Sequence, residues 1–334
     1  MKLKITDFIK DQWTTLPLVS GVDLSAKTII VSGANVGLGL ETAKHFARMH
    51  PARLIVTCRS AAKGEETVAE RFAKEGSGGA RLDILVENAA VSPTQLEFTK
   101  DGWESTTQIN VLSTSLLALL LLPRMLETAQ KYKTTPRILV ATSELHHMAR
   151  FDADIVNSGN FFRRYAHRGS VDPALDVGKQ YFGTKVLTIF FVRALSARLH
   201  RKPLIASAPN PGLCRTSLRR SFTGAVYVAT TLLGIMLGRS AECGSRVFVW
   251  AALSGEEEGS GEGERDGEEG RRDELRGAYI SSARVDEPSD YIVSEEGRSA
   301  QDKIWDNLIE ELAKIEPKVQ QIVKECLTPP APST

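Results

Sequence analysis

The stretch Lys27-Thr-Ile-Ile-Val-Ser-Gly-Ala-Asn-Val-Gly-Leu-Gly39 decides the fold class of this chain. Its first six residues form a short β-branched run, which predicts a buried strand. The glycines Gly33, Gly37 and Gly39 then form a turn before a helical pattern. Glycine lets the backbone approach a pyrophosphate, and a helix N-terminus supplies N–H donors and positive potential. The stretch predicts a dinucleotide-binding βα unit, and tight packing alone is the alternative for an isolated glycine turn.

Further apolar runs alternate with helical patterns along the chain and are candidate strands: Arg53 to Thr57, Leu82 to Val86, Arg137 to Thr142 and Leu204 to Ser207. Strands alternating with helices predict a parallel sheet. We expect an α/β fold with a single Rossmann-type, doubly wound parallel sheet. The interval between Gly39 and Asn88 is short for such a fold. We therefore expect the usual edge strand 3 and its following helix to be absent.

The composition is that of an ordinary globular protein. Of 334 residues, 42% are hydrophobic and 25% charged, with a net charge of +1, which excludes fibrous and collagenous classes and gives no basic field for nucleic acid. The four cysteines are far apart and suggest neither a disulfide framework nor a zinc site. The first residues lack the apolar region of a secretory signal. We expect a cytoplasmic protein that binds neither metal nor nucleic acid.

Composition shifts divide the chain. We interpret residues 1–26 as an N-terminal arm, 27–320 as the α/β domain and 321–334 as a frayed tail. Residues 254–276 contain ten acidic residues, six glycines and no aromatic residue, so we predict a disordered acidic insertion in a surface loop. Structure is expected to resume at Ala278, and Ser299 to Lys314 predicts an amphipathic helix.

Two uncharged segments bear on membrane contact. Leu112 to Leu122 ends before Pro123 and is too short to span a bilayer, which needs about 20 residues, so we interpret it as a buried helix. Phe222 to Gly238 is longer. We favour a mobile helix over an apolar pocket for this segment, with peripheral membrane contact as the alternative.

Tyr181-Phe-Gly-Thr-Lys185, with Ser143 upstream at a strand end, is the strongest candidate for chemistry. Residues four apart share a helix face, so the phenol and the ammonium can be neighbours. A nearby cation favours phenolate and lowers a tyrosine pKa from its ordinary value of about 10. We expect Tyr181 to be the acid in a reduction, and Ser143 to hydrogen-bond the substrate carbonyl. Asn110 would hold a water linked to Lys185. An ordinary surface Tyr/Lys pair is the alternative.

The end of the second strand bears on the choice of nucleotide. Arg59 stands where a dinucleotide fold meets the adenosine ribose, with Lys63 following. An acidic residue there favours NAD, whereas an arginine accommodates a 2′-phosphate. We expect NADP(H), and an exposed arginine without this role is the alternative.

In this order, these motifs resemble those of the short-chain dehydrogenase/reductase family, over roughly residues 26–254 and 278–318. The family's turn T-G-x-x-x-G-x-G corresponds to Ser32–Gly39, its N-N-A-G to Glu87–Ala90 and its Y-x-x-x-K to Tyr181–Lys185. The resemblance implies a catalytic tetrad of Asn110, Ser143, Tyr181 and Lys185. It also implies a cofactor site formed by Gly33, Asn35, Gly37, Leu38, Gly39, Arg59, Lys63, Asn88, Lys185, Pro211, Gly212 and Thr216.

Within the family, Cys58-Arg59-Ser60 and Ser143-Glu-Leu-His146 resemble the retinol-dehydrogenase-like branch and its relatives in fungal secondary metabolism, which usually prefers NADP(H). His146 and His147 are then structural or substrate-lining residues. By analogy, a homodimer would form through the Leu116 to Leu122 helix and the Tyr181 helix.

The long serine-to-tyrosine interval predicts an extended loop whose aromatic residues either line an apolar pocket or pack the loop down: Phe151, Phe161, Phe162 and Tyr165, together with Phe222 and Tyr227. The first interpretation favours a small lipophilic ketone, aldehyde or secondary alcohol, such as a secondary-metabolite intermediate. The function expected is thus an NADP(H)-dependent ketoreductase or alcohol dehydrogenase. The alternative is a catalytically impaired or silent dinucleotide-binding protein, because a βα unit is missing.

Overall fold

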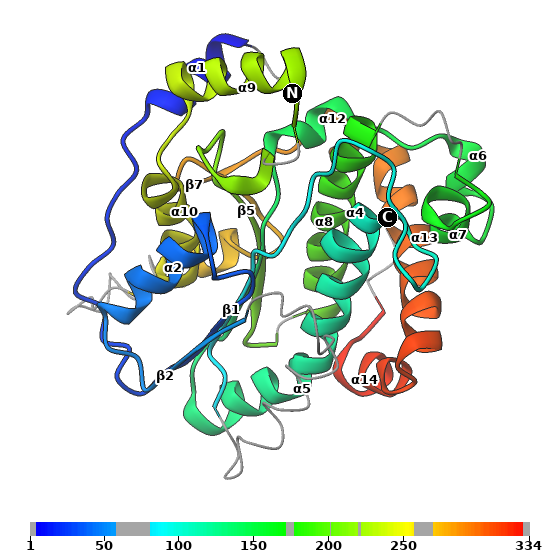
Figure 1. The fold of residues 1–334 in the computed structure, drawn as a ribbon. Helices are drawn as coiled ribbons and strands as arrows, with labels where there is room; N and C mark the ends of the chain where they lie inside the picture. The colour runs from blue at the N-terminus through cyan, green and yellow to red at the C-terminus, as the bar shows by residue number, and fades with distance from the viewer. Residues whose placement is uncertain are drawn as a thin grey trace.

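A seven-stranded sheet forms the centre of the part of the chain that the computed structural model describes, residues 5–57, 81–171, 177–200, 202–219, 222–256 and 270–329 (Figure 1). Its strand order is β2-β1-β3-β4-β5-β6-β7. All neighbours pair in parallel except β6 and β7, which are antiparallel. The strands are β1 (Thr28–Val31), β2 (Arg53–Val56), β3 (Ile84–Glu87), β4 (Arg137–Val140), β5 (Ile205–Asn210), β6 (Tyr279–Ser281) and β7 (Arg284–Asp286).

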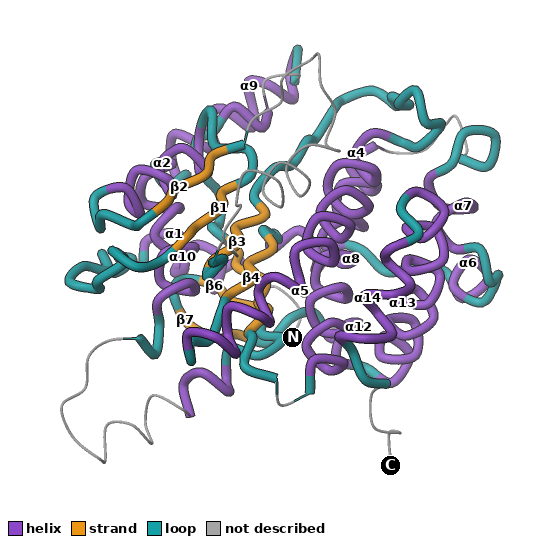
Figure 2. Tube along the Cα trace, turned by 90° about the horizontal axis from the view of Figure 1, so that it is seen from below, coloured by secondary structure: helices purple, strands orange, loops and turns teal. Residues whose placement is uncertain are grey.

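Helices cover both faces of this sheet, as a doubly wound fold requires (Figure 2). Side chains alternate between the faces of a strand. In β1, Ile30 belongs to the core beneath the helices α5 (Thr114–Tyr132) and α8 (Val177–Leu199). Ile29 belongs to the core beneath α2 (Gly37–Ala47) and α10 (Ala241–Leu253) on the other face. Leu85 and Val86 divide in the same way in β3. The Rossmann-type α/β fold expected from the sequence is confirmed.

The helices connect the strands and extend the fold at both ends. In chain order they are α1 (Ile5–Trp13), α2 (Gly37–Ala47), α4 (Ser105–Thr107), the π-helix η1 (Gln108–Ser113), α5 (Thr114–Tyr132), the 3₁₀ helix η2 (Glu144–Met148), α6 (Ala153–Val156), α7 (Phe161–Ala166), α8 (Val177–Leu199), the 3₁₀ helix η3 (Ser217–Arg219), α9 (Gly224–Leu237), α10 (Ala241–Leu253), α12 (Asp290–Val293), α13 (Glu295–Ile315) and α14 (Lys318–Cys326).

The predicted strands are confirmed at β1 to β5, with ends that differ by up to three residues. The hairpin of β6 and β7 was not predicted beyond the resumption of structure at Ala278. Its turn places Ser282 and Ala283 at φ of 52° and 57°, a conformation that normally favours glycine or asparagine. The sequence therefore carries no ordinary turn signal there.

The apolar helix is longer than predicted. Helix continues from Ser105 to Tyr132 through α4, η1 and α5, and Pro123 lies inside it rather than at its end. In the described part of the chain, this is the one helix long and apolar enough to cross a membrane, and 56% of its most apolar window is buried inside the protein. Leu119 and Leu122 are fully buried in the core. The prediction of a buried helix is confirmed, but its premise of a short segment was wrong.

The segments predicted as an N-terminal arm and a frayed tail are partly ordered in the structure. Within the expected frayed tail, α14 is helical to Cys326, and Leu327 is buried against the core. In the N-terminal arm, α1 packs against α9, and Leu16 and Leu24 are buried. Burial of apolar side chains holds both segments in place.

Two predictions lie wholly or partly outside the described residues. The absence of edge strand 3 concerns residues 58–80, and the described order places β2 at one end of the sheet. The centre of the acidic insertion, residues 257–269, also lies outside. At its C-terminal end the structure differs from the prediction, because Leu275 is buried and the Arg276 guanidinium donates to the carbonyl oxygens of Lys202 and Leu204.

The C-terminal helices cover the surfaces through which a homodimer is expected. α13 packs on α8, and α14 packs on α5. Any dimer through α5 and α8 must therefore use the parts of these helices that α13 and α14 leave uncovered.

Candidate functional site

The glycine turn lies at the carboxyl end of β1, where α2 begins. Gly33 and Gly37 have φ of +64° and +61°, which disfavour residues with a Cβ. A Cβ at Gly33 would stand 2.9 Å from the Ala89 Cα, and one at Gly39 would stand 2.4 Å from the Gly33 carbonyl oxygen. Here glycine is required by close backbone approach as well as by conformation. The turn presents the N-terminus of α2 at this edge of the sheet, an arrangement suited to a phosphate.

Asn88 holds this turn in place. Its Nδ2 donates to the carbonyl oxygens of Ser32 and Gly33, at 3.1 and 3.2 Å. The Ser32 hydroxyl accepts hydrogen bonds from the backbone N–H groups of Asn88 and Ala89 in return. The segment after β3 and the turn after β1 thus form one hydrogen-bonded unit. Asn88, one of the predicted cofactor residues, therefore uses its side-chain amide to hold the backbone of the glycine turn.

The segment after β5 reaches the same turn from the other side. A Cβ at Gly37 would lie 3.5 Å from the Thr216 Cβ, so Thr216 faces the glycine turn. Gly212 has a φ of +77°, and its N–H donates to the Asn210 side chain at 3.0 Å. The Pro211 carbonyl oxygen accepts a hydrogen bond from the Arg239 guanidinium.

The remaining predicted cofactor residues divide into three groups. Asn35 is exposed on the turn. Leu38 is half-buried and faces α10, because a Cβ at Gly244 would stand 3.0 Å from it. Arg59 and Lys63 lie outside the described residues.

Tyr181 and Lys185 lie one turn apart on α8, and both are buried, with 7% and 3% of their surfaces exposed. The Lys185 Nζ lies 5.3 Å from the centroid of the Tyr181 ring and donates to the Ala141 carbonyl oxygen at 3.1 Å. Burial lowers the pKa of Lys185 to about 8, so the ammonium form predominates at neutral pH and is lost as the pH rises through that value. The alternative of an exposed surface pair is wrong.

Ser143 follows the end of β4, which is tied to α8 at Lys185. Besides the bond from Lys185 to Ala141, the Thr142 hydroxyl donates to the Lys185 carbonyl oxygen at 3.1 Å. Ser143 caps η2, and its hydroxyl accepts from the Leu145 N–H at 3.3 Å. These contacts bring the strand end that carries Ser143 against the helix that carries the tyrosine and the lysine.

Asn110 is buried in the π-helix η1, where the widened turn alters the direction of the side chain. Its amide exchanges hydrogen bonds with the Val91 backbone, accepting from N–H at 2.9 Å and donating to the carbonyl oxygen at 3.1 Å. It also donates to the Thr184 hydroxyl at 3.3 Å, and this hydroxyl donates to the Tyr181 carbonyl oxygen. Asn110 therefore contacts α8 through Thr184.

The sequence predicts no role for Glu144 and no catalytic role for His146, and both lie close to Ser143 along η2. His146 is fully buried, and burial lowers its pKa to about 3, so the ring stays neutral. Its Nε2 accepts the Ser289 N–H, and we infer that Nδ1 donates to the Ser143 carbonyl oxygen at 2.7 Å. Burial also raises the pKa of Glu144 to about 7. His146 is thus structural, which was one of its two predicted interpretations.

The described residues contain no group of three or more histidine, cysteine, aspartate or glutamate side chains placed to hold a metal ion.

The aromatic residues of the loop between Ser143 and Tyr181 form a packed cluster. Phe151 contacts Phe161, Tyr165 and Phe190, with ring centroids 5.1 to 6.4 Å apart, and Phe161 and Phe162 are fully buried. The interpretation that these residues pack the loop down is therefore the correct one. Burial also raises the pKa of Tyr165. Tyr227 lies apart from this cluster, half-exposed on α9.

This cluster packs against α8 at Gly183, midway between Tyr181 and Lys185. A Cβ at Gly183 would overlap the Tyr165 hydroxyl and stand 3.3 Å from the Phe151 ring. We expect Gly183→Ala to lower the free energy of unfolding by about 1–3 kcal/mol, because the half-buried Tyr165 ring is packed against Phe151 and Phe161 and has little room to move.

The double variant Gly183→Ala/Tyr165→Phe provides the control, since it removes the hydroxyl that the new methyl group meets. Among the described residues, that hydroxyl makes one long hydrogen bond, to the Gln180 carbonyl oxygen at 3.4 Å. We expect this double variant to recover most of the stability that Gly183→Ala loses, as measured by denaturant unfolding. If Tyr165→Phe instead adds to the loss, the contact is not the cause.

Comparison with known proteins places this geometry in a family. No model of a protein family matches the chain. The short-chain dehydrogenase atnD of Emericella nidulans is 32% identical over 292 residues, covering 78% of this chain and 90% of that protein. The short-chain dehydrogenase/reductase dmxR8 of a Cryptosporiopsis species is 28% identical over 334 residues, covering 91% and 96%.

Solved structures agree on the fold. An uncharacterised protein from Mycobacterium paratuberculosis superposes with a TM-score of 0.57 at 20% identity, covering 90% of this chain and 98% of that one. The carbonyl reductase Sniffer of Drosophila melanogaster has a TM-score of 0.51 at 14% identity, covering 79% and 99%. With these relatives, this chain belongs to the short-chain dehydrogenase/reductase family of oxidoreductases.

Proposed function

We propose that this chain is an NADP(H)-dependent carbonyl reductase or alcohol dehydrogenase acting on a small lipophilic substrate, such as an intermediate of secondary metabolism. The observation that carries the proposal is the buried pair on α8, in which the Lys185 Nζ lies 5.3 Å from the centroid of the Tyr181 ring. A buried phenol beside a buried ammonium is suited to giving or taking a proton near neutral pH.

The residues around the glycine turn fit a dinucleotide. Gly33, Gly37 and Gly39 keep side chains out of the turn, and the N-terminus of α2 offers N–H donors to a pyrophosphate. Thr216 would meet the nicotinamide end, and Lys185 would hold the nicotinamide ribose. Among the described residues, the Lys185 Nζ donates one hydrogen bond, so an ammonium with three donors can serve another acceptor. Arg59 and Lys63 support a preference for NADP(H) by sequence position alone.

A bound nicotinamide supplies the hydride that a carbonyl carbon accepts. In this direction the Tyr181 hydroxyl gives its proton to the carbonyl oxygen, and the Lys185 ammonium stabilises the phenolate that remains. Ser143 would donate a hydrogen bond to the same oxygen and so fix its position. In the oxidation direction Tyr181 takes the proton back from the alcohol.

Support for a lipophilic substrate comes from α9, because the loop aromatics belong to the core. α9 begins eight residues after Thr216 and contains no charged residue. A helix of this composition beside the nicotinamide end offers apolar contacts to a substrate and no partner for a charged one.

Titration with NADPH and NADH, followed by assay of apolar ketones and aldehydes, tests the proposal. We expect tighter binding of NADPH and consumption of NADPH with at least one carbonyl. Binding of NADPH without turnover of any carbonyl would favour the alternative of a silent dinucleotide-binding protein. Absence of binding to either nucleotide would contradict both.

A further inference from the structure

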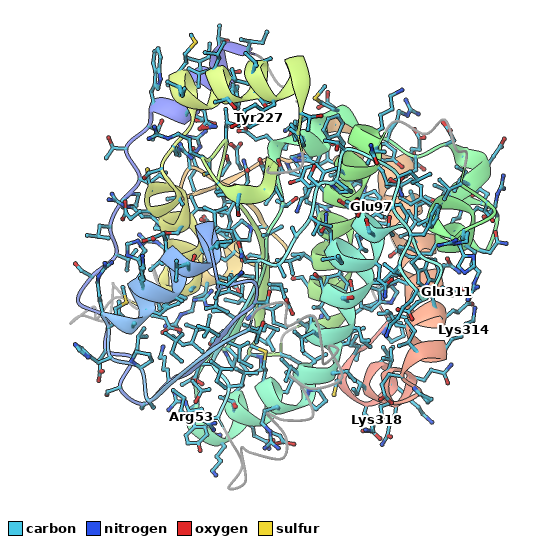
Figure 3. All side chains as sticks on the ribbon, in the orientation of Figure 1. Arg53, Glu97, Tyr227, Glu311, Lys314 and Lys318 are labelled. Atoms are coloured by element: carbon cyan, nitrogen blue, oxygen red, sulfur yellow. The ribbon has the colours of Figure 1, made fainter. Side chains whose placement is uncertain are left out.

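The surface formed by α1 and α9 is unusually apolar for a part of the chain facing solvent. The two helices lie side by side (Figure 1), and Figure 3 labels Tyr227 on α9. Large apolar side chains of α9 are 43 to 73% exposed, and Ile5 and Trp13 of α1 are 76% and 70% exposed. We define this apolar surface by seven of its exposed members, Ile5, Trp13, Tyr227, Val228, Leu232, Ile235 and Met236.

Fixed backbone contacts hold this surface at the nicotinamide end of the site. Two backbone hydrogen bonds join the residues that precede and follow the segment containing α9. The Arg215 N–H donates to the Arg239 carbonyl oxygen, and the Arg239 N–H donates to the Leu213 carbonyl oxygen, both at 2.9 Å. Gln12 of α1 lies against Gly212, where an added Cβ would stand 2.9 Å from its Nε2. The apolar surface is therefore attached directly to the segment that precedes Thr216.

The exposed side chains surround most of α9. At 100° per residue, the exposed positions from Tyr227 to Met236 spread over about 240° of the helix circumference. The remaining arc contains Gly234, which is buried, and Leu237. A protein partner covers one side of a helix, whereas the acyl and headgroup boundary of a bilayer can surround an immersed helix on several sides.

Charge at the edge of the surface selects the kind of bilayer. The chain has no acidic residue between 177 and 241, and Arg215, Arg219 and Arg220 precede α9 in sequence. On the α1 side there are two aspartates, Asp7 and Asp11, and Asp11 is paired with Arg284. Arg215 is exposed, as is Lys10 on α1. Basic residues beside an apolar helix attract anionic headgroups, and Trp13 and Tyr227 are residue types enriched at membrane interfaces.

We propose that the apolar surface of α1 and α9 docks the protein on an anionic lipid bilayer, with α9 lying in the interface plane. Docking in this way would place the nicotinamide end of the site next to the lipid. The proposal concerns binding, and it can be tested without cofactor or substrate, so that its failure and that of the proposed reaction are distinguishable.

Vesicle flotation of the full chain tests this docking. Vesicles of phosphatidylcholine mixed with phosphatidylserine should carry the protein, and vesicles of phosphatidylcholine alone should carry less. The double variant Ile235→Ser/Met236→Ser should lower partitioning onto the mixed vesicles by at least about tenfold, since it removes two apolar side chains from contact with the lipid. High salt should weaken binding to the mixed vesicles, because it screens the arginines.

The chain offers a matched control. Met148 is 63% exposed on η2 and Ile315 55% exposed on α13, so neither belongs to α1 or α9. The double variant Met148→Ser/Ile315→Ser removes the same two side-chain types and should float as the unaltered protein does. Equal flotation of the two double variants would overturn the proposal, as would failure of the unaltered protein to float. Self-association that Ile235→Ser/Met236→Ser abolishes, without flotation, would assign the surface to a second copy and also overturn it.

Discussion

Tyr181→Phe is expected to lower kcat/KM for carbonyl reduction by about 10²- to 10⁴-fold, the range in which a positioned general acid contributes. The substitution removes only the hydroxyl, and the buried ring beside Lys185 remains to fill its place on α8. Hydride transfer without a proton donor would leave a charged alkoxide, which water is poorly placed to protonate in a buried site. The loss is measured by NADPH consumption with the most active carbonyl found.

Two comparisons make this loss specific to proton transfer. NADPH affinity should be unchanged in Tyr181→Phe, because the proposed nucleotide contacts lie in the glycine turn, Thr216 and Lys185. Tyr132→Phe removes a hydroxyl from a partly exposed tyrosine of α5 and should retain full activity. Comparable kcat/KM in Tyr181→Phe and the unaltered protein would exclude Tyr181 as the acid.

Gly33→Ala is expected to abolish nucleotide binding and to lower the free energy of unfolding by about 1–3 kcal/mol. The residue has a φ of +64°, and its Cβ would stand 2.9 Å from the Ala89 Cα. The backbone atoms of Ala89, its Cα at 2.9 Å and its N at 3.1 Å, would be too close to the added Cβ. The clash can be relieved only by moving either the turn after β1 or the segment after β3. Either movement would break the hydrogen bonds that join Ser32 to Asn88. Thermal unfolding and NADPH titration measure the two effects.

Gly159→Ala separates close approach from backbone strain. Gly159 has a φ of +71°, similar to that of Gly33, but a Cβ there would meet no atom within 4 Å. This variant should show only the cost of the left-handed conformation and retain nucleotide binding. If Gly33→Ala is no worse than Gly159→Ala in both measurements, the packing explanation for the turn is wrong.

The parts of the fold that follow from local periodicity could be predicted from the sequence. The β-branched run at β1 and the apolar runs at β3 and β4 are buried on both faces, which is the pattern of a parallel sheet covered by helices. The hairpin of β6 and β7 could not be predicted, because its turn uses Ser282 and Ala283. The sequence also did not predict that α1 forms an ordered helix, because its position depends on contacts with α9, more than two hundred residues away in sequence.

The candidate site divides in the same way. The neighbourhood of Tyr181 and Lys185 follows from helix geometry, since residues four apart share a face. Thr216 meets the glycine turn because the carboxyl ends of parallel strands lie at one edge of the sheet. Whether Phe151 and Phe161 line a pocket or fill the core could not be decided, because both environments favour the same side chains. The buried state of Glu144, likewise, depends on elements distant in sequence.

The central claim is that Tyr181 gives the proton while the nicotinamide gives the hydride. Its most direct test is transfer of deuterium in a single turnover to an apolar ketone, with NADPH deuterated first on one face of nicotinamide C4 and then on the other. We predict that the unaltered protein places deuterium on the carbinol carbon of the alcohol, and that Tyr181→Phe does so at least about a hundredfold more slowly with NADPH still bound. Transfer at equal rates in the two proteins, or NADPH bound with no deuterated alcohol from any ketone tried, would contradict it.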